Sequence, residues 1–445
     1  MMRRPAWVWA SLLAASLGAA QETADVDVID QVRSVEDRIA TIVRSKPPGH
    51  LLALRADEAA RTAAARERAT RLLPAGQAAA RGRAWRDIGL GSEDDPAALV
   101  LALATDLVGM SFDADRTRLL VDPGRLRADD GRGDPEKDDG SSVLLATGVA
   151  PDEPVAGHYA AHAILDGPDL AGPIETDALL ARSALAEGSA NLAALLLLFG
   201  GVGLEAEVVS GTLRPEDALG GRLVSEAMRG GSPVVSHLLQ FVYLDGFAQA
   251  ATLAKKADFG HVTRERQRRK TTRDVLHLDR APAPAAELPG PSIPAGVGLV
   301  AVDRDTIGEQ GIISLVSLGT GKDNLGMIAG DGWAADALYR LEPPVGSGPG
   351  ADGLTVWITR WASEEDAKDF AYAIERCVQA RFPASSFAPD ESGAGRILRE
   401  PTGVHRLSRN VLEVRVQVAP PALDARLTIP VKKKGPERRS TPAKK

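Results

Sequence analysis

Two histidines four residues apart constrain this chain more than any other feature of its sequence. His158 and His162 lie in an apolar, alanine-rich stretch, residues 157–166, whose composition favours an α-helix. Side chains at positions i and i+4 of a helix lie one above the other on the same face, so both imidazoles can reach one ion. The spacing therefore predicts a helix that presents two metal ligands at one point.

The residue after the first histidine decides what such a site could do. In the His-Glu-x-x-His pattern of zinc hydrolases, the glutamate is the general base that activates the metal-bound water. Tyr159 stands at that position here. A phenol has an ordinary pKa of about 10, which makes it a poor base near neutral pH. Loss of a positioned base costs roughly a hundred- to ten-thousand-fold in rate. The sequence thus predicts a ligand pair without its base.

A third ligand is expected from the next helix. This helix should run from about residue 178 to 188, and it carries Glu187. A carboxylate there completes a His₂Glu set and leaves a fourth position for water, as in catalytic zinc sites. Asp166, four residues after His162, could orient a ligand imidazole through a hydrogen bond to the ring nitrogen that does not bind the metal. The predicted cofactor is therefore Zn²⁺, although two histidines on a helix can also be ordinary polar or core groups.

Composition narrows the class of protein. The 445 residues suffice for two or three domains. The net charge of −7 argues against a general nucleic-acid binder, so no nucleic-acid partner is expected. The single cysteine, Cys377, excludes an internal disulfide framework and a cysteine-based zinc cluster.

The first twenty residues have the pattern of a signal peptide. Arg3 and Arg4 precede a short apolar run, which ends in a small-residue cleavage site at residues 18–20. We therefore expect export to the periplasm or the cell exterior, with no membrane span after cleavage. An uncleaved signal that anchors the protein to the membrane is the alternative.

Changes of pattern divide the chain into six expected segments. These are a signal peptide at 1–20, a helical segment at 21–95, a core domain at 96–280, a proline-rich linker at 281–295, a C-terminal α/β domain at 296–430 and a basic, disordered tail at 431–445. The expected fold class is α+β, with a mainly helical core that includes a small β-hairpin, followed by the smaller α/β domain.

Local patterns predict individual elements. Residues 51–73 are rich in alanine, arginine and glutamate and predict one helix. Ser363, with Asp366 three residues later, forms a near capping box that predicts a helix start. Residues 405–416 predict a closing hairpin that turns at 408–410.

The order of these motifs resembles that of bacterial zincin-like proteins of the gluzincin type. The similar stretches are His158–Asp166, Ala184–Gly188, Tyr243–Gly246 and Thr271–His277, followed beyond the linker by 332–336 and 361–367. The resemblance implies a zincin-like core with zinc at His158, His162 and Glu187. It also implies that Tyr243 and His277 are candidate stabilisers of a transition state. The chain departs from the family at Tyr159, and also at Arg273 and Asp274, where the family has Glu and Gln.

These matches and departures lead to a functional hypothesis with two alternatives. The hypothesis is an exported, catalytically impaired metallopeptidase homologue, a pseudoenzyme that keeps its zinc ligands and binds an unknown protein or envelope component. One alternative is an active zinc-dependent peptidase that uses a non-standard base. The other is a metal-free structural or interaction protein. Whether the chain is an enzyme stays open, and the missing base favours the view that it is not.

Overall fold

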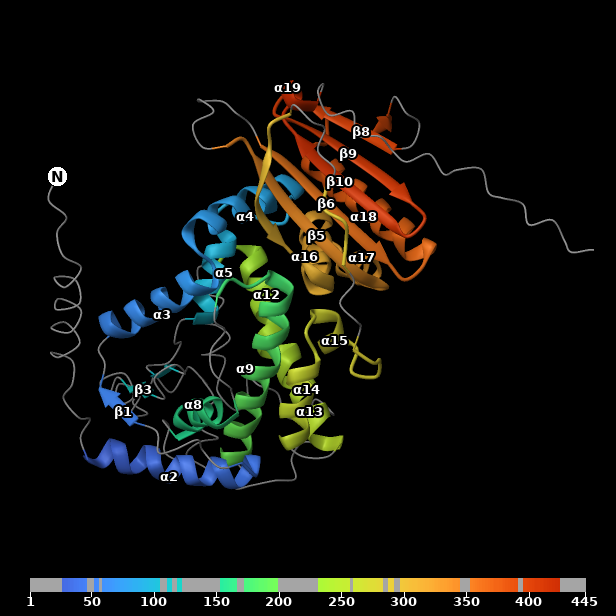
Figure 1. Cartoon of the computed structure of the whole chain (residues 1–445). Helices are drawn as coiled ribbons and strands as arrows, with labels where there is room; N and C mark the ends of the chain where they lie inside the picture. Colours follow the sequence, from blue (N-terminus) through green and yellow to red (C-terminus); the bar gives the residue numbers. More distant parts are fainter. Residues whose placement is uncertain are drawn as a thin grey trace, which may run out of the picture.

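The computed structural model consists of a mainly helical N-terminal part and a C-terminal part built on a sheet (Figure 1). This arrangement confirms the expected α+β class. The residues that the structure describes are 26–45, 52–55, 58–104, 110–113, 118–121, 153–165, 172–198, 231–256, 259–282, 287–291, 297–344, 353–390 and 395–424.

The N-terminal part contains most of the helices. They are α2 (Val26–Val43), α3 (Glu58–Leu72), α4 (Ala75–Ile88), α5 (Asp95–Ala104), α8 (Glu153–Leu165), α9 (Thr176–Leu198), α12 (Pro233–Gln240), η1 (Phe241–Asp245, a π-helix), α13 (Gly246–Lys256), α14 (Phe259–Arg268) and α15 (Thr272–Leu276). Among the described helices, none is both long and apolar enough to cross a membrane.

Helix α9 forms the centre of the helical part and contacts α2, α8, η1, α13, α14 and α15. Nearly all of its side chains are buried, because alanine and leucine occupy every side of the helix. A helix that is apolar all round belongs in the interior of a protein. Glu187 lies in the middle of this helix, so its carboxylate is held on a rigid element.

A small sheet accompanies the helices. Strands β2 (Met110–Asp113) and β3 (Arg118–Val121) pair antiparallel, which confirms the expected hairpin. Strand β1 (Leu52–Arg55) pairs in parallel with β3 and gives the order β1-β3-β2. The prediction of one helix over 51–73 was therefore wrong at its start. The pairing partner of β1 lies more than sixty residues away, and no local pattern reports such a contact.

The C-terminal part is a seven-stranded antiparallel sheet with helices. Its strands are β4 (Val300–Asp305), β5 (Trp333–Glu342), β6 (Leu354–Trp361), β7 (Ala388–Pro389), β8 (Gly395–Glu400), β9 (Gly403–Asn410) and β10 (Glu413–Ala419), in the order β4-β5-β6-β10-β9-β8-β7. Its helices are α16 (Gly308–Thr320), α17 (Asp323–Gly330), α18 (Glu364–Arg381) and α19 (Pro421–Asp424).

Two local predictions can be compared directly with this part. Ser363 and Asp366 form a reciprocal capping box at the start of α18, as expected. The closing hairpin is present, but its turn lies at Val411 and Leu412 instead of 408–410. Strand β9 continues to Asn410, which pairs with Glu413. The polar residues 408–410, which suggested a turn, are therefore part of the strand, because they pair with β10.

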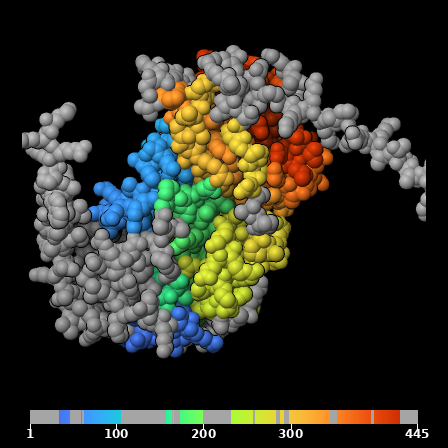
Figure 2. All heavy atoms as spheres, in the orientation of Figure 1, coloured from blue at the N-terminus to red at the C-terminus, as the bar shows by residue number. Residues whose placement is uncertain are grey.

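The two parts meet at a buried polar junction. Arg81 of α4 is ion-paired with Asp303 of β4 at 3.2 Å. The indole N–H of Trp85 donates to Asp305 at 3.2 Å, and the backbone N–H of Thr176 donates to the same carboxylate at 2.8 Å. Figure 2 shows the described residues of both parts directly against each other. The junction thus ties the N-terminus of α9 to the edge of the sheet.

Two buried aspartates complete the junction. Asp177 of α9 accepts hydrogen bonds from the backbone N–H and the hydroxyl of Thr272, at 2.9 and 2.6 Å. Asp336 of β5 accepts from the backbone N–H of Gly308 at 2.9 Å and from the indole of Trp357 at 2.8 Å. The backbone N–H of Asp177 also donates to the carbonyl of Thr306 at 2.9 Å, so the C-terminal part holds helix α9 at its start, ten residues before Glu187.

Candidate metal centre

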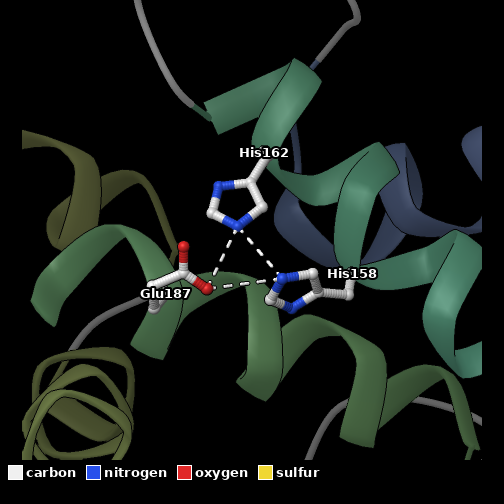
Figure 3. A group of neighbouring side chains, drawn as sticks. All are labelled: His158, His162 and Glu187. Carbon is white, nitrogen blue, oxygen red and sulfur yellow. Dashed lines mark hydrogen bonds and ion pairs between the residues drawn. The ribbon is translucent and has the colours of Figure 1, made fainter. Parts of the chain in front are cut away.

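Three polar side chains converge between α8 and α9 (Figure 3). The Nε2 atoms of His158 and His162 are 3.1 Å apart. Glu187 places its Oε2 atom 3.4 Å from Nε2 of His158 and 3.5 Å from Nε2 of His162. The structure thus brings together the three residues that the sequence selected as ligands, and it does so with one atom from each pointing at a common centre.

The size of this triangle suits a small divalent metal. Two ligand atoms bound about 2.1 Å from a tetrahedral zinc ion lie roughly 3.4 Å apart. The three separations in the structure, 3.1, 3.4 and 3.5 Å, surround that value. Two imidazoles and a carboxylate are also a common donor set of zinc sites with an open fourth position. The group can therefore hold a metal in the arrangement that the fold already provides.

The electrostatics favour the metal-binding forms of two of the three side chains, His158 and Glu187. Burial lowers the pKa of the His158 imidazole and favours its neutral form. Burial alone would raise the pKa of Glu187, but the neighbouring imidazoles of His162 and His158 outweigh it and hold that pKa far below its ordinary range. Neutral imidazole and ionised carboxylate are the forms that act as ligands.

Glycines beside the ligands allow the helices to come this close. A Cβ atom on Gly157, next to His158, would lie 2.7 Å from Cδ2 of Leu197 on α9. A Cβ atom on Gly188, next to Glu187, would lie 2.1 Å from the backbone oxygen of Gly246 at the start of α13. At Gly188 the neighbour is backbone, so a larger residue would require movement of the backbone, whereas at Gly157 the end of the Leu197 side chain would have to shift. Gly188 therefore sets the distance of α13 from α9, and Gly157 leaves room for the Leu197 side chain between α8 and α9.

Asn191 is a further residue at the site, which the sequence analysis missed. Among the described residues, Nδ1 of His158 and Oδ1 of Asn191 are buried atoms without a hydrogen-bond partner. The Asn191 side chain faces His158, since it raises the pKa of that imidazole against the effect of burial. An Nδ1–H group of His158 can donate to this amide oxygen while Nε2 serves as ligand. The available signal was position: Asn191 lies one helical turn after Glu187.

The remaining predicted site residues have different environments. Tyr159 is buried, with its ring centroid 5.0 Å from that of His158 and 6.2 Å from that of His162. Tyr243 is buried in the π-helix η1, which contacts α9. π-Helical turns are rare in proteins, and those that occur are often found at functional sites.

His277 and Asp166 are less closely connected to the group. The imidazole of His277 is bonded to Glu309 of α16 at 2.8 Å and has no hydrogen bond or ion pair with the three candidate ligands. Asp166 lies outside the described residues. The structure thus surrounds the three ligands with Tyr159 and Asn191, and it ties His277 to the C-terminal part.

Comparison with known proteins gives one match. A family model described as a domain of unknown function (DUF8575) matches residues 298–427, which include the whole seven-stranded sheet. No curated protein and no solved structure matches the chain. The match therefore covers the C-terminal part and leaves the candidate metal centre outside it.

Proposed function

We propose that this protein is an exported, zincin-like pseudoenzyme that holds a divalent metal, with zinc as the first choice, at His158, His162 and Glu187. The observation that carries the proposal is the ligand triangle itself, with its edges of 3.1, 3.4 and 3.5 Å. The motif order, with its resemblance to gluzincin-type proteins, adds support. Its role is to bind a protein or envelope component instead of hydrolysing peptides efficiently.

The residues around the triangle explain why binding is favoured over hydrolysis. A bound zinc ion supplies a Lewis acid with one open position, which can polarise an oxygen of a bound group. Tyr159, at the position of the general base, carries a phenol in place of a carboxylate, and a phenol accepts a proton from water poorly. The group that Nδ1 of His158 can reach is the neutral amide of Asn191, whereas the partner of a ligand histidine is often a carboxylate that increases its basicity. The site therefore keeps its three candidate metal ligands but lacks the general base that would take a proton from water.

Metal content is the direct test of the site. The purified protein, a His162→Ala variant and a His261→Ala control would be analysed by inductively coupled plasma mass spectrometry after dialysis with excess zinc. His261 lies on α14 and belongs to no candidate metal group among the described residues. We expect about one zinc per chain in the protein and the control, and almost none in His162→Ala. Absence of zinc in all three, or its retention in His162→Ala, would overturn the metal site and favour the metal-free alternative.

A second experiment tests the impaired chemistry. Substitution of Tyr159→Glu restores a carboxylate at the position of the base, and its effect on hydrolysis of casein would be compared with Tyr159→Gln, which has similar size but no basic group. We expect zinc-dependent hydrolysis by Tyr159→Glu at least about a hundredfold above the protein and the Gln variant. Efficient zinc-dependent hydrolysis by the unaltered protein would instead establish the active peptidase alternative.

A further inference from the structure

A groove on the C-terminal part has a chemical character that the metal centre does not explain. It lies between α17 and α18 and encloses about 250 Å³. Its lining includes Lys322, Leu325, Ile328, Tyr372, Arg376 and Ala380. The lining thus combines apolar side chains with two cations and contains no acidic residue.

The exposed residues of the groove follow the helical period. On α18, Tyr372, Arg376 and Ala380 are spaced by four residues and so form one stripe along the helix. Ile328 faces the groove from α17, one turn after Asn324. Tyr372 is 57% exposed and Ile328 is 51% exposed, and Met327 beside it is 59% exposed. Large apolar side chains gathered at one exposed place mark an interaction site more often than a chance surface.

The positive charges of the groove are not neutralised by the protein itself. Within the described part of the chain, the side chains of Lys322 and Arg376 form no ion pair. Glu375, which precedes Arg376 in the sequence, is ion-paired with Arg396 at 2.9 Å. This local excess of positive charge contrasts with the net charge of −7 of the whole chain. A partner for the groove therefore has to bring negative charge as well as apolar surface.

We propose that the groove between α17 and α18 binds a short segment of a partner protein in which apolar residues are accompanied by aspartate or glutamate. The apolar side chains pack against Ile328, Leu325 and Tyr372, while the carboxylates pair with Lys322 and Arg376. Such a segment follows the usual pattern of a peptide or helix bound in a helical groove. The concave shape favours an inserted segment over the flat surface of a bilayer, and complementary charge fixes which segments bind.

Selection from random peptides tests this proposal without knowledge of the natural partner. A phage-displayed library of random peptides, each about twelve residues long, would be selected on the full-length protein, because roughly three helical turns suffice to fill such a groove. The dissociation constants of the enriched peptides would then be measured by fluorescence anisotropy. The variants would be Arg376→Glu, Lys322→Glu and Tyr372→Ser, all exposed positions, and the control would be Arg264→Glu, an exposed arginine of α14.

The expected result has three parts. The enriched peptides combine apolar residues with Asp or Glu, they bind Arg376→Glu and Lys322→Glu at least about tenfold more weakly, and they bind the Arg264→Glu control unchanged. Exchange of the acidic peptide residues for lysine restores binding to Arg376→Glu. Enriched peptides without acidic residues, or equal binding to the groove variants, would overturn the proposal. Loss in the groove variants of binding to phosphatidylglycerol vesicles, without any such peptide, would identify a lipid surface as the ligand instead.

Discussion

The buried carboxyl group of Asp177 should make the stability of this protein fall as pH rises. Burial raises the pKa of Asp177 from 3.8 to about 8, although the hydrogen bonds from Thr272 lower it, and the nearby Asp336 and Asp274 raise it further. The folded protein therefore keeps this group protonated at neutral pH, whereas the unfolded chain ionises it. The substitution Asp177→Asn tests this directly.

The amide of asparagine closely imitates the protonated carboxyl group. Both hydrogen bonds from Thr272 end on Oδ1, which asparagine retains. A Cβ atom on Gly308 would lie 1.8 Å from this Oδ1, so the pocket is tightly filled and only an isosteric change is tolerated. The variant thus keeps the packing and the accepted hydrogen bonds, and it removes the ionisation.

The sign and the size follow from linkage. Below the ordinary pKa both states are protonated and there is no cost. Between about pH 4 and 8 only the unfolded state ionises, so the free energy of unfolding falls with rising pH, and above the folded-state pKa the loss is complete. A shift from 3.8 to about 8 corresponds to a ceiling of about 6 kcal/mol at about 1.4 kcal/mol per unit. We expect a loss of about half this ceiling. The effective dielectric constant at buried sites is well above that of a dry protein interior, so burial raises the pKa less than the ceiling assumes.

Urea unfolding at several pH values measures the effect. At about pH 4 the protein and Asp177→Asn should be similarly stable, and at about pH 8.5 the variant should be more stable by roughly 3 kcal/mol. Asp279→Asn, a change at an exposed aspartate, is the control and should alter neither value nor slope. A stability difference that is independent of pH, or one that decreases as pH rises, would refute the assignment of a protonated Asp177 to the junction.

Three further outcomes are expected. Gly188→Ala should lower the free energy of unfolding by about 1–3 kcal/mol and reduce zinc content, because its Cβ would meet Gly246; thermal unfolding and metal analysis measure both. Arg81→Met should cost about 3–5 kcal/mol in urea unfolding because it leaves buried Asp303 unpaired, and a smaller loss than that would argue against a tight junction. Burial raises the pKa of the Cys377 thiol to about 12, so the native protein should react with Ellman's reagent roughly a thousandfold more slowly than the urea-unfolded chain, and equal rates would contradict its burial.

The ligand set illustrates what local sequence can reveal. His158 and His162 share a helix, so their spacing alone predicts that both face one point. The α+β class and the capping box at Ser363 are equally local, because periodicity and end signals act within a few residues. The sequence also selected Glu187 in the following helix as the third ligand, and the resemblance to gluzincin-type proteins implied the same residue. The structure places it 3.4 Å from His158.

Other features depend on contacts between distant segments. Residues 118–121 belong to the hairpin that was expected, but their parallel pairing with Leu52–Arg55 leaves no mark in the latter segment, which was predicted as the start of a helix. The position of Asn191 beside His158 depends on how α8 packs against α9. Likewise, the bond between His277 and Glu309 depends on the docking of the C-terminal part.

The sequence by itself thus determined the chemistry available to this protein: two imidazoles, a carboxylate and a phenol in place of a base. Only the tertiary structure decided that the three ligand atoms meet within bonding reach of one ion, that Asp177 is buried and protonated, and that two cations line a groove without a partner in the described chain. The reason is physical. Local spacing fixes which side chains share a face, whereas burial and charge pairing arise only when elements far apart in the chain pack together.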